Sequence, residues 1–458
     1  MLKLVLAFFA GSAMSKILVF ALLPIYTRLL EPSEYGYYDL SITYLTIIAS
    51  MIFLDVWVAT MRFMHLNESL NSKNSAILSG LLLFSASTLV LILTGTIMAM
   101  VLAIPFLWLI VTYGITSNLK EFYGFVARGL DQNFAFTISG AVNTIVMVAL
   151  NVLLLVVLHW DLSALYIASI IANLAQCIIL EFRTAVTRRI HVSGFDRELT
   201  LQMLRFALPL GLNSVSYWLL TGVGKIVVQH EMSIEINGYF AVGSKFGALV
   251  VVISGVFTMA WQDIAFSRGS NVSNGFYRRA SSYYLLLTTL GLVLVLPATS
   301  IAFPILVGDA YSLAFPLIPS FLAVAALGSF STFVGNIFYA LNRTNVVFYS
   351  TVIACAVNLI LCVPFVQLWG VIGANAAIAI GFVVGLIVRS IILARLISFG
   401  YRLGDLAIIV VTTTSSFIVY SLTDLWLSVA YIVLVLIVAL VLYRNLIKSL
   451  LAGLRRSE

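Results

Sequence analysis

Charged residues are scarce in this chain, and their scarcity excludes a soluble protein. Only 9% of the 458 residues are Asp, Glu, Lys or Arg, and 62% are hydrophobic, whereas about 25% of the residues of a soluble domain are charged. Apolar runs recur along the whole chain, and a helix of about 20 such residues crosses the hydrocarbon core of a bilayer. The sequence therefore predicts an all-α polytopic membrane protein.

Cysteine and histidine are scarce as well. The three cysteines, Cys177, Cys355 and Cys362, each lie inside an apolar run, so their spacing indicates neither a disulfide framework nor a metal site. The four histidines are isolated from one another in the sequence. The sequence also lacks a phosphate-cradling glycine loop and a nucleophile–base pair. We therefore predict no cofactor, no metal and no enzymatic activity.

The apolar runs predict fourteen membrane-spanning helices joined by short loops. Their boundaries are placed where the apolar runs meet polar or turn-forming residues. The predicted spans are 4–26, 38–61, 77–96, 100–120, 134–158, 163–182, 206–228, 238–262, 281–303, 315–340, 346–367, 371–394, 406–422 and 426–443.

Lysine and arginine are distributed unevenly between the two sides of these spans. If the N-terminus is cytoplasmic, all but four of the 25 basic residues fall on the cytoplasmic side, which is the positive-inside bias of membrane proteins. Both termini are then cytoplasmic, and the net charge of +7 reflects topology rather than a nucleic-acid partner. The four exceptions are Lys16, Arg28, Lys225 and Lys245.

The longest loop, residues 183–205, is basic and is predicted to lie as an amphipathic linker on the cytoplasmic surface. It separates an N-terminal lobe of six spans, residues 1–182, from a C-terminal lobe of six spans, residues 206–394. Residues 395–458 then hold two extra spans and a cytoplasmic tail. This arrangement predicts two lobes related by a pseudo-two-fold axis along the membrane normal, as in transporters built from parallel repeats.

An internal repeat supports the two lobes. The tripeptide Gly-Tyr-Tyr at 36–38 enters the second span, and Gly-Tyr-Phe at 238–240 enters the eighth. Further along, Ala-Val-Asn at 141–143 in the fifth span matches Ala-Val-Asn at 356–358 in the eleventh. Both matches fall at equivalent topological positions. The alternative is chance similarity, because apolar sequences draw on few residue types.

Charged side chains inside spans mark candidate functional sites, because each costs roughly 2.5–3.5 kcal/mol to insert. Lys16 lies near the middle of the first span with Ser12 and Ser15 beside it, which indicates a helix face turned away from lipid. The alternative is that the Lys16 side chain extends toward the membrane surface.

Acidic residues are fewer in these spans. Asp55 lies in the second span, and Arg62 follows seven residues later on the same helical face. Asp55 is predicted either to carry a coupling proton or to form an ion pair, with Lys16 or Arg62 as its partner. Glu31 and Asp39, near the first outer loop, are predicted to be solvated turn residues, as is Glu34.

The cations outnumber Asp55. Lys16, Arg28, Lys225 and Lys245 therefore predict a cationic cavity that suits an anionic ligand, since phosphates pair well with lysine and arginine. Arg28 and Lys225 lie close to the outer surface, where reaching out to solvent is an equal alternative.

Three stretches resemble a known family. The stretch PIYTRLLEPSEYGYYDL (24–40) resembles the first loop of polysaccharide biosynthesis flippases of the Wzx type. RFALPLGLNSVSYW (205–218) resembles that family's entry to its second lobe, and FVARGLDQN (125–133) resembles its fourth-span exit. The resemblance covers the first twelve spans and implies a place in the multidrug/oligosaccharidyl-lipid/polysaccharide (MOP) exporter superfamily.

The resemblance implies a flippase of the bacterial inner membrane. Such a protein moves an undecaprenyl-pyrophosphate-linked oligosaccharide, the repeat unit of O-antigen, capsule or exopolysaccharide, to the outer leaflet by alternating access. The implied partners are this lipid-linked oligosaccharide, membrane lipids and other polysaccharide assembly proteins. By position, the family's basic cavity residues correspond to Lys16, Arg28, Lys225 and Lys245.

Two alternatives stay open. A cation-coupled multidrug exporter of the same fold would need acidic residues in its central helices, where only Asp55 qualifies. A membrane enzyme that uses lipid-linked sugars would need a large outer loop to hold its acceptor, and the predicted outer loops are short.

Overall fold

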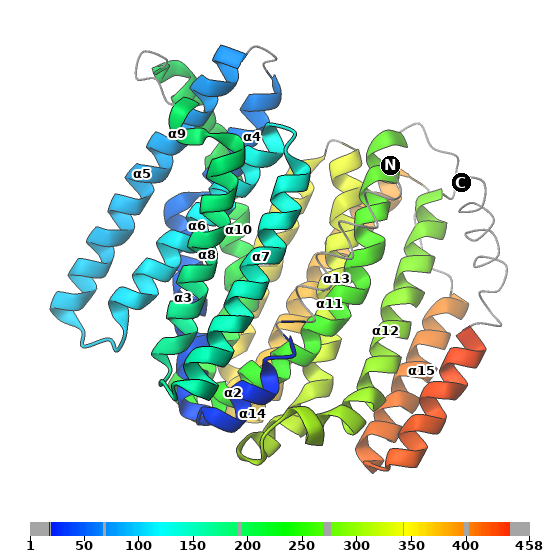
Figure 1. Cartoon of the computed structure of the whole chain (residues 1–458). Helices are drawn as coiled ribbons and strands as arrows, with labels where there is room; N and C mark the ends of the chain where they lie inside the picture. The colour runs from blue at the N-terminus through cyan, green and yellow to red at the C-terminus, as the bar shows by residue number, and fades with distance from the viewer. Residues whose placement is uncertain are drawn as a thin grey trace, which may run out of the picture. The chain divides into compact units, whose positions relative to one another are not determined.

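The computed structural model describes residues 18, 20–66, 70–189, 195–268, 276–341, 343–397 and 403–439 (Figure 1). These residues form helices and turns and contain no strand, so the all-α prediction is confirmed. The helices are α2 Leu23–Leu29, α3 Pro32–Phe53, α4 Val56–Leu66, α5 Leu70–Val101, α6 Leu107–Gly129, α7 Asn133–Asn151, η1 Val152–Val157, α8 Ser163–Thr184, α9 Val186–Arg189, α10 Arg197–Glu231, α11 Ile234–Arg268, α12 Phe276–Leu306, η3 Asp309–Leu317, α13 Ile318–Ala340, α14 Thr344–Leu396, α15 Leu403–Leu422 and a last helix, Leu425–Ala439.

About half of these helices are long and apolar enough to cross a membrane. Among the described residues, 8 helices meet this condition, or up to 9 if the bent pair α3–α4 is one span. Helix α14 accounts for two predicted spans, because its 53 residues contain a non-helical Gly370 with φ 58°. Helices α6, α15 and Leu425–Ala439 match three more predicted spans. The chain is therefore a multi-pass membrane protein. Residues 1–17 of the first predicted span lie outside the described residues.

The second predicted span, 38–61, is not one straight helix. Leu54 and Asp55 both adopt left-handed conformations, with φ 49° and 52°, and α3 and α4 meet there at a bend of 41°. The sequence does not predict this break, because neither residue is glycine or proline, the residues that usually mark such positions.

The start of α10 also differs from the prediction. Asp196 caps this helix, and its side chain accepts a hydrogen bond from the Leu199 nitrogen at 3.1 Å, as N-terminal caps do. The last residues of the predicted surface linker, from Arg197 onward, are therefore the first turns of a 35-residue helix that continues to Glu231. Pro209 lies inside α10 without ending it.

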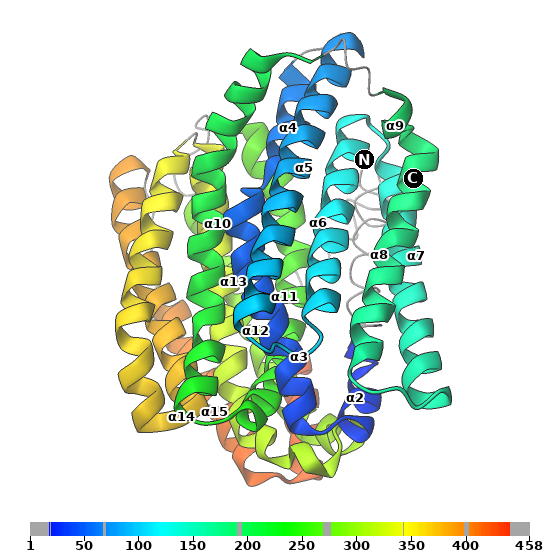
Figure 2. The same ribbon diagram turned by 90° about the vertical axis from the view of Figure 1, so that its left-hand side faces the viewer.

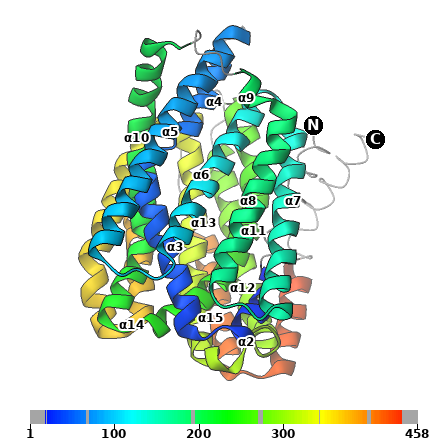
Figure 3. The same cartoon turned by 60° about the vertical axis from the view of Figure 1, so that its left-hand side comes forward.

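The chain divides into two compact units. Unit 1 comprises Met1–Val242 and Thr344–Leu386, and unit 2 comprises Gly243–Arg343 and Ile387–Glu458. In unit 1, α8 packs against both α6 and α7, and α3, α5 and α6 run side by side (Figures 2 and 3). Helix α10 packs against α3, α4 and α5.

Aromatic and polar contacts hold the helices of unit 1 together. The ring of Phe84 on α5 lies 5.1 Å from that of Phe53 on α3 and 5.5 Å from that of Phe122 on α6, measured between centroids. The hydroxyls of Ser41 and Tyr166 are 2.6 Å apart and join α3 to α8. Such contacts matter in a bilayer, where close packing and hydrogen bonds replace the hydrophobic effect between helices.

Unit 2 has its own aromatic core. Tyr284 on α12 stacks on Phe333 of α13 with ring centroids 4.3 Å apart, and Trp261 of α11 lies 5.0 Å from the same ring.

Arg389 is 5% exposed, and it donates to the Ser331 carbonyl at 2.6 Å and to the Ser331 hydroxyl at 2.8 Å. These bonds satisfy a cation that would be costly to leave unpaired within the unit.

Candidate functional site: charged groups and close helix contacts

The two copies of the Gly-Tyr motif meet in unit 1. Gly36 and Gly238 occupy equivalent places near the starts of α3 and α11. A Cβ added to Gly36 would lie 2.6 Å from the Gly238 backbone nitrogen, and one added to Gly238 would lie 2.7 Å from the Pro32 carbonyl carbon. The two helices therefore touch backbone to backbone, at a distance that only glycine permits.

Asp39 and Lys225 form an ion pair close to this contact. The Lys225 Nζ lies 2.5 Å from the Asp39 Oδ2, and the two side chains are 16% and 15% exposed. The Lys225 ammonium also lies 5.7 Å from the centre of the Phe240 ring. Asn237 supports the pair from α11, because its side-chain nitrogen donates to the Lys225 carbonyl at 3.0 Å.

The prediction that Asp39 is a solvated turn residue is wrong. Helix α3 already begins at Pro32, where Glu31 and Glu34 form a capping box. The Glu34 carboxylate accepts from the Glu31 nitrogen at 2.9 Å, which ties both ends of the first turn. Asp39 consequently lies inside the helix, on the side that meets α10. The capping pattern Glu-Pro-Ser-Glu at 31–34 was the sequence signal that could have placed it there.

Asp55 lies at the break between α3 and α4. The Ser214 hydroxyl of α10 donates a hydrogen bond to its carboxylate. Helix α10 comes close at this level, because a Cβ on Gly211 would lie 2.6 Å from the Leu54 Cα. The partly buried carboxylate is thus held between the broken span and α10, and a carboxylate within a predicted span marks a candidate functional site.

The partner of Arg62 is an aromatic ring rather than Asp55. Its guanidinium carbon lies 4.0 Å from the centre of the Phe206 ring on α10, which is the geometry of a cation–π contact. In the part of the chain that the structure describes, salt bridges join Lys225 to Asp39 and Lys120 to Glu121. The structure therefore places Asp55 with Ser214 and Arg62 with Phe206, rather than with each other.

The structure describes two of the three remaining predicted cations, one in each unit. Arg28 is exposed in the last turn of α2, in unit 1. Lys245 is partly buried on the part of α11 that belongs to unit 2. Lys16 lies outside the described residues. Within the described ranges, no group of His, Cys, Asp or Glu side chains could hold a metal ion.

Solved structures show which fold these elements make. No protein-family model matches the sequence, and no curated protein matches it significantly. In three dimensions the chain resembles the lipid II flippase MurJ in an inward closed conformation, with a TM-score of 0.72, 16% identity and coverage of 96% of this chain and 99% of that one.

The chain also resembles multidrug transporters. An inward-facing MATE family transporter of the MOP superfamily gives a TM-score of 0.68 and 14% identity over 83% of this chain and 95% of that one. A mutant of the Vibrio cholerae MATE transporter VcmN gives 0.60 and 13% identity over 86% and 96%. At such identities the likeness establishes the fold, and this chain has the fold shared by MATE transporters and the lipid II flippase.

Proposed function

We propose that this protein is a flippase that moves an undecaprenyl-pyrophosphate-linked oligosaccharide across the bacterial inner membrane, with both termini in the cytoplasm. The observation that carries the proposal is the excess of cations in and beside the spans, on a fold shared with a lipid II flippase. Lys16, Arg28, Lys225 and Lys245 offer the positive charge that a pyrophosphate needs.

The Asp39–Lys225 pair gives these cations an order of action. In this conformation Asp39 neutralises Lys225, so the Lys16 and Lys245 ammonium groups receive the pyrophosphate first. The Asp39–Lys225 pair and the Gly36–Gly238 contact lie at the end of unit 1 that the loop charges predict to face outward, here called the predicted outer end. When these contacts open, Lys225 loses its partner and becomes a second anion site at the predicted outer end.

Export of surface glycan tests the proposal. Lys16→Ala and Lys245→Ala are each expected to abolish export while the protein stays in the membrane. Lys73→Ala is the matched control, because Lys73 lies on α5 at the predicted cytoplasmic end and should leave export unchanged. Wild-type export in both test variants would overturn the role of these cations.

A reconstituted assay separates transport from the rest of the pathway. Purified protein in liposomes is given a polyprenyl-pyrophosphate oligosaccharide, and its sugar is attacked from outside by an added glycosidase. We expect the protein to bring the inner-leaflet pool within reach of the enzyme. If the inner pool stays protected, the protein is not a flippase for this lipid.

A cation-coupled multidrug exporter is the second candidate, favoured by Asp55. This intramembrane carboxylate is held by Ser214 at a helix break, where a cationic drug or a coupling proton could be bound. Cells that express the protein distinguish the two candidate functions, because a multidrug exporter would raise the resistance of the cells to cationic dyes and lower dye accumulation. We expect no such change.

A further inference from the structure

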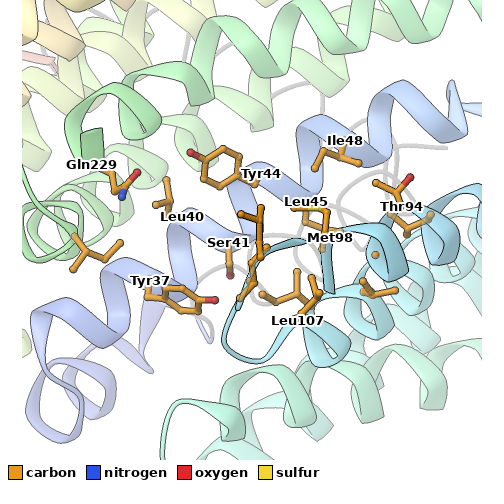
Figure 4. Close-up of a pocket in the computed structure, with 17 residues that line it drawn as sticks. Tyr37, Leu40, Ser41, Tyr44, Leu45, Ile48, Thr94, Met98, Leu107 and Gln229 are labelled. Carbon is orange, nitrogen blue, oxygen red and sulfur yellow. The ribbon is translucent and has the colours of Figure 1, made fainter. Parts of the chain in front are cut away.

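An apolar pocket of about 480 Å³ lies within unit 1 at the predicted outer end. Its walls come from one face of α3, the last turns of α5, the turn that follows α5 and the first turns of α6. Gln229 of α10 and Ile234 of α11 complete the lining. Figure 4 shows the labelled side chains of α3, α5 and α6 around this space, with Gln229 reaching it from α10. Nothing in the proposed transport of a glycan uses this pocket.

Three of the five polar side chains in the walls donate hydrogen bonds to backbone carbonyls, and the other two are Tyr44 and Gln229. The Tyr37 hydroxyl donates to the Pro105 carbonyl at 2.6 Å, and the Thr94 hydroxyl donates to the Val90 carbonyl at 2.8 Å. The Ser41 hydroxyl donates to the Tyr38 carbonyl at 2.7 Å. The other wall residues are almost all aliphatic. Such walls bind water poorly, because a water molecule needs two to four polar partners, so the fitting occupant is apolar.

The volume fits one hydrocarbon chain. An apolar cavity of about 150 Å³ holds one benzene molecule. The pocket offers roughly three times that space, which corresponds to a chain of about 18 carbon atoms on the same scale. One fatty-acyl chain has this size, whereas the polyprenyl tail of a lipid-linked oligosaccharide is far longer.

The rim of the pocket adjoins a surface suited to lipid. Leu102, a lining residue, is 52% exposed, and the side chains beside it on α5 are more exposed still: Ile97 63%, Val101 74% and Met100 81%. Large apolar side chains exposed on a membrane-spanning helix face acyl chains. An acyl chain on that surface would therefore meet the rim of the pocket at Leu102.

We propose that this pocket binds one acyl chain of a membrane phospholipid from the predicted outer leaflet. The chain fills the space between α3, α5 and α6 and touches the α10–α11 turn through Gln229 and Ile234. A bound lipid then bridges elements from the two halves of the sequence, beside the Asp39–Lys225 pair on the neighbouring face of α3.

Photo-crosslinking tests the site directly. The full chain is reconstituted in nanodiscs with a trace of phosphatidylglycerol that carries a diazirine in the middle of one acyl chain, and labelled peptides are identified by mass spectrometry. We expect the label on α3 and on the end of α5, near Met98 and Leu102. Labelling confined to the outward surface of α5, at residues such as Ile97, would overturn the proposal.

Filling the pocket supplies the control. Thr94→Phe places a ring in the space and should lower labelling of α3 at least fivefold, whereas Ile97→Phe on the lipid-facing side of α5 should not. Met98→Trp is a second filling variant if Thr94→Phe does not fold, as judged by a single symmetrical gel-filtration peak. Equal labelling of α3 in both filling variants and the control would contradict the site.

A competing probe identifies the occupant. A diazirine-labelled polyprenyl phosphate at the same concentration is expected to label the pocket weakly. If this probe labels α3 and the phospholipid does not, the acyl-chain assignment is overturned. These measurements need neither glycan nor transport, so their failure is distinguishable from failure of the proposed flippase activity.

Discussion

The backbone nitrogen of Gly238 lies 2.6 Å from where a Cβ of Gly36 would be. Two glycines that the internal repeat had aligned at a distance of 202 residues are thus in contact with each other. Neither residue can carry a side chain while α3 and α11 keep this spacing. The contact brings together, within unit 1, the residues that enter the second and the eighth predicted spans.

The first prediction follows from this contact. Gly36→Val and Gly238→Val should each push α3 and α11 apart and hold the predicted outer end open, which blocks an alternating cycle. We expect glycan export to fall at least tenfold. A cysteine introduced at Ser33 should also react faster with an impermeant thiol reagent in these variants than in the otherwise unchanged protein. The native cysteines described are buried, so they should add little to the signal.

Gly140→Val is the matched control for both variants, because a Cβ at Gly140 meets nothing within 4 Å. If Gly36→Val reacts and exports like Gly140→Val, the helices do not need this close approach during transport.

The second prediction concerns the Asp39–Lys225 pair. Asp39→Asn and Lys225→Gln should each lower stability by about 2 kcal/mol, between the costs typical of exposed and of fully buried pairs, because each leaves one charge without its partner. Thermal unfolding in detergent, followed by tryptophan fluorescence, gives the shifts. The double variant should be less destabilised than the sum of the single ones, with a coupling of about 1 kcal/mol. Strict additivity would mean that the two side chains do not interact.

The third prediction concerns Asp55. Asp55→Asn keeps the size of the side chain and a hydrogen-bonding partner for Ser214 but removes the acid. If Asp55 carries a coupling proton, transport by the variant should no longer respond to an imposed pH gradient, while Asp131→Asn, at an exposed turn, should respond as the wild type does. Flipping rates in liposomes with and without the gradient provide the measurement. An undiminished response in Asp55→Asn would assign the carboxylate a structural role.

The fourth prediction separates Arg62 from Asp55. The cation–π contact with Phe206 should contribute about 0.5–1 kcal/mol, so Phe206→Leu should lower the unfolding temperature slightly and Arg62→Gln should do the same. A double-mutant cycle of Arg62 with Phe206 should show coupling, whereas a cycle of Arg62 with Asp55 should show none. The reverse result would restore the ion pair that the sequence suggested.

The positions of most helices could be predicted because each apolar run averages over many residues. The partners of the charged residues could not be predicted from such averages. Asp39 and Lys225 lie on α3 and α10, and only the packing of those helices brings them together. The break at Leu54 and Asp55 could not be predicted either, because neither residue marks a break locally and the close approach of Gly211 to Leu54 is a tertiary contact. By contrast Pro209, a strong local signal for a break, lies inside a continuous helix.

The break at Leu54 and Asp55 has a mechanical consequence. Hydrogen bonding along a helix makes it a stiff rod, and two left-handed residues interrupt that rod in the middle of a span. Helix α4 is anchored against α5 and α6, whereas α3 packs most extensively against α10. Helix α10 contacts both α3 and α4, so a change in the angle at the break shifts both helices against α10. The break carries a carboxylate, so a change in the charge of Asp55 acts at the position where a small change in angle moves the far ends of α3 and α4 the most.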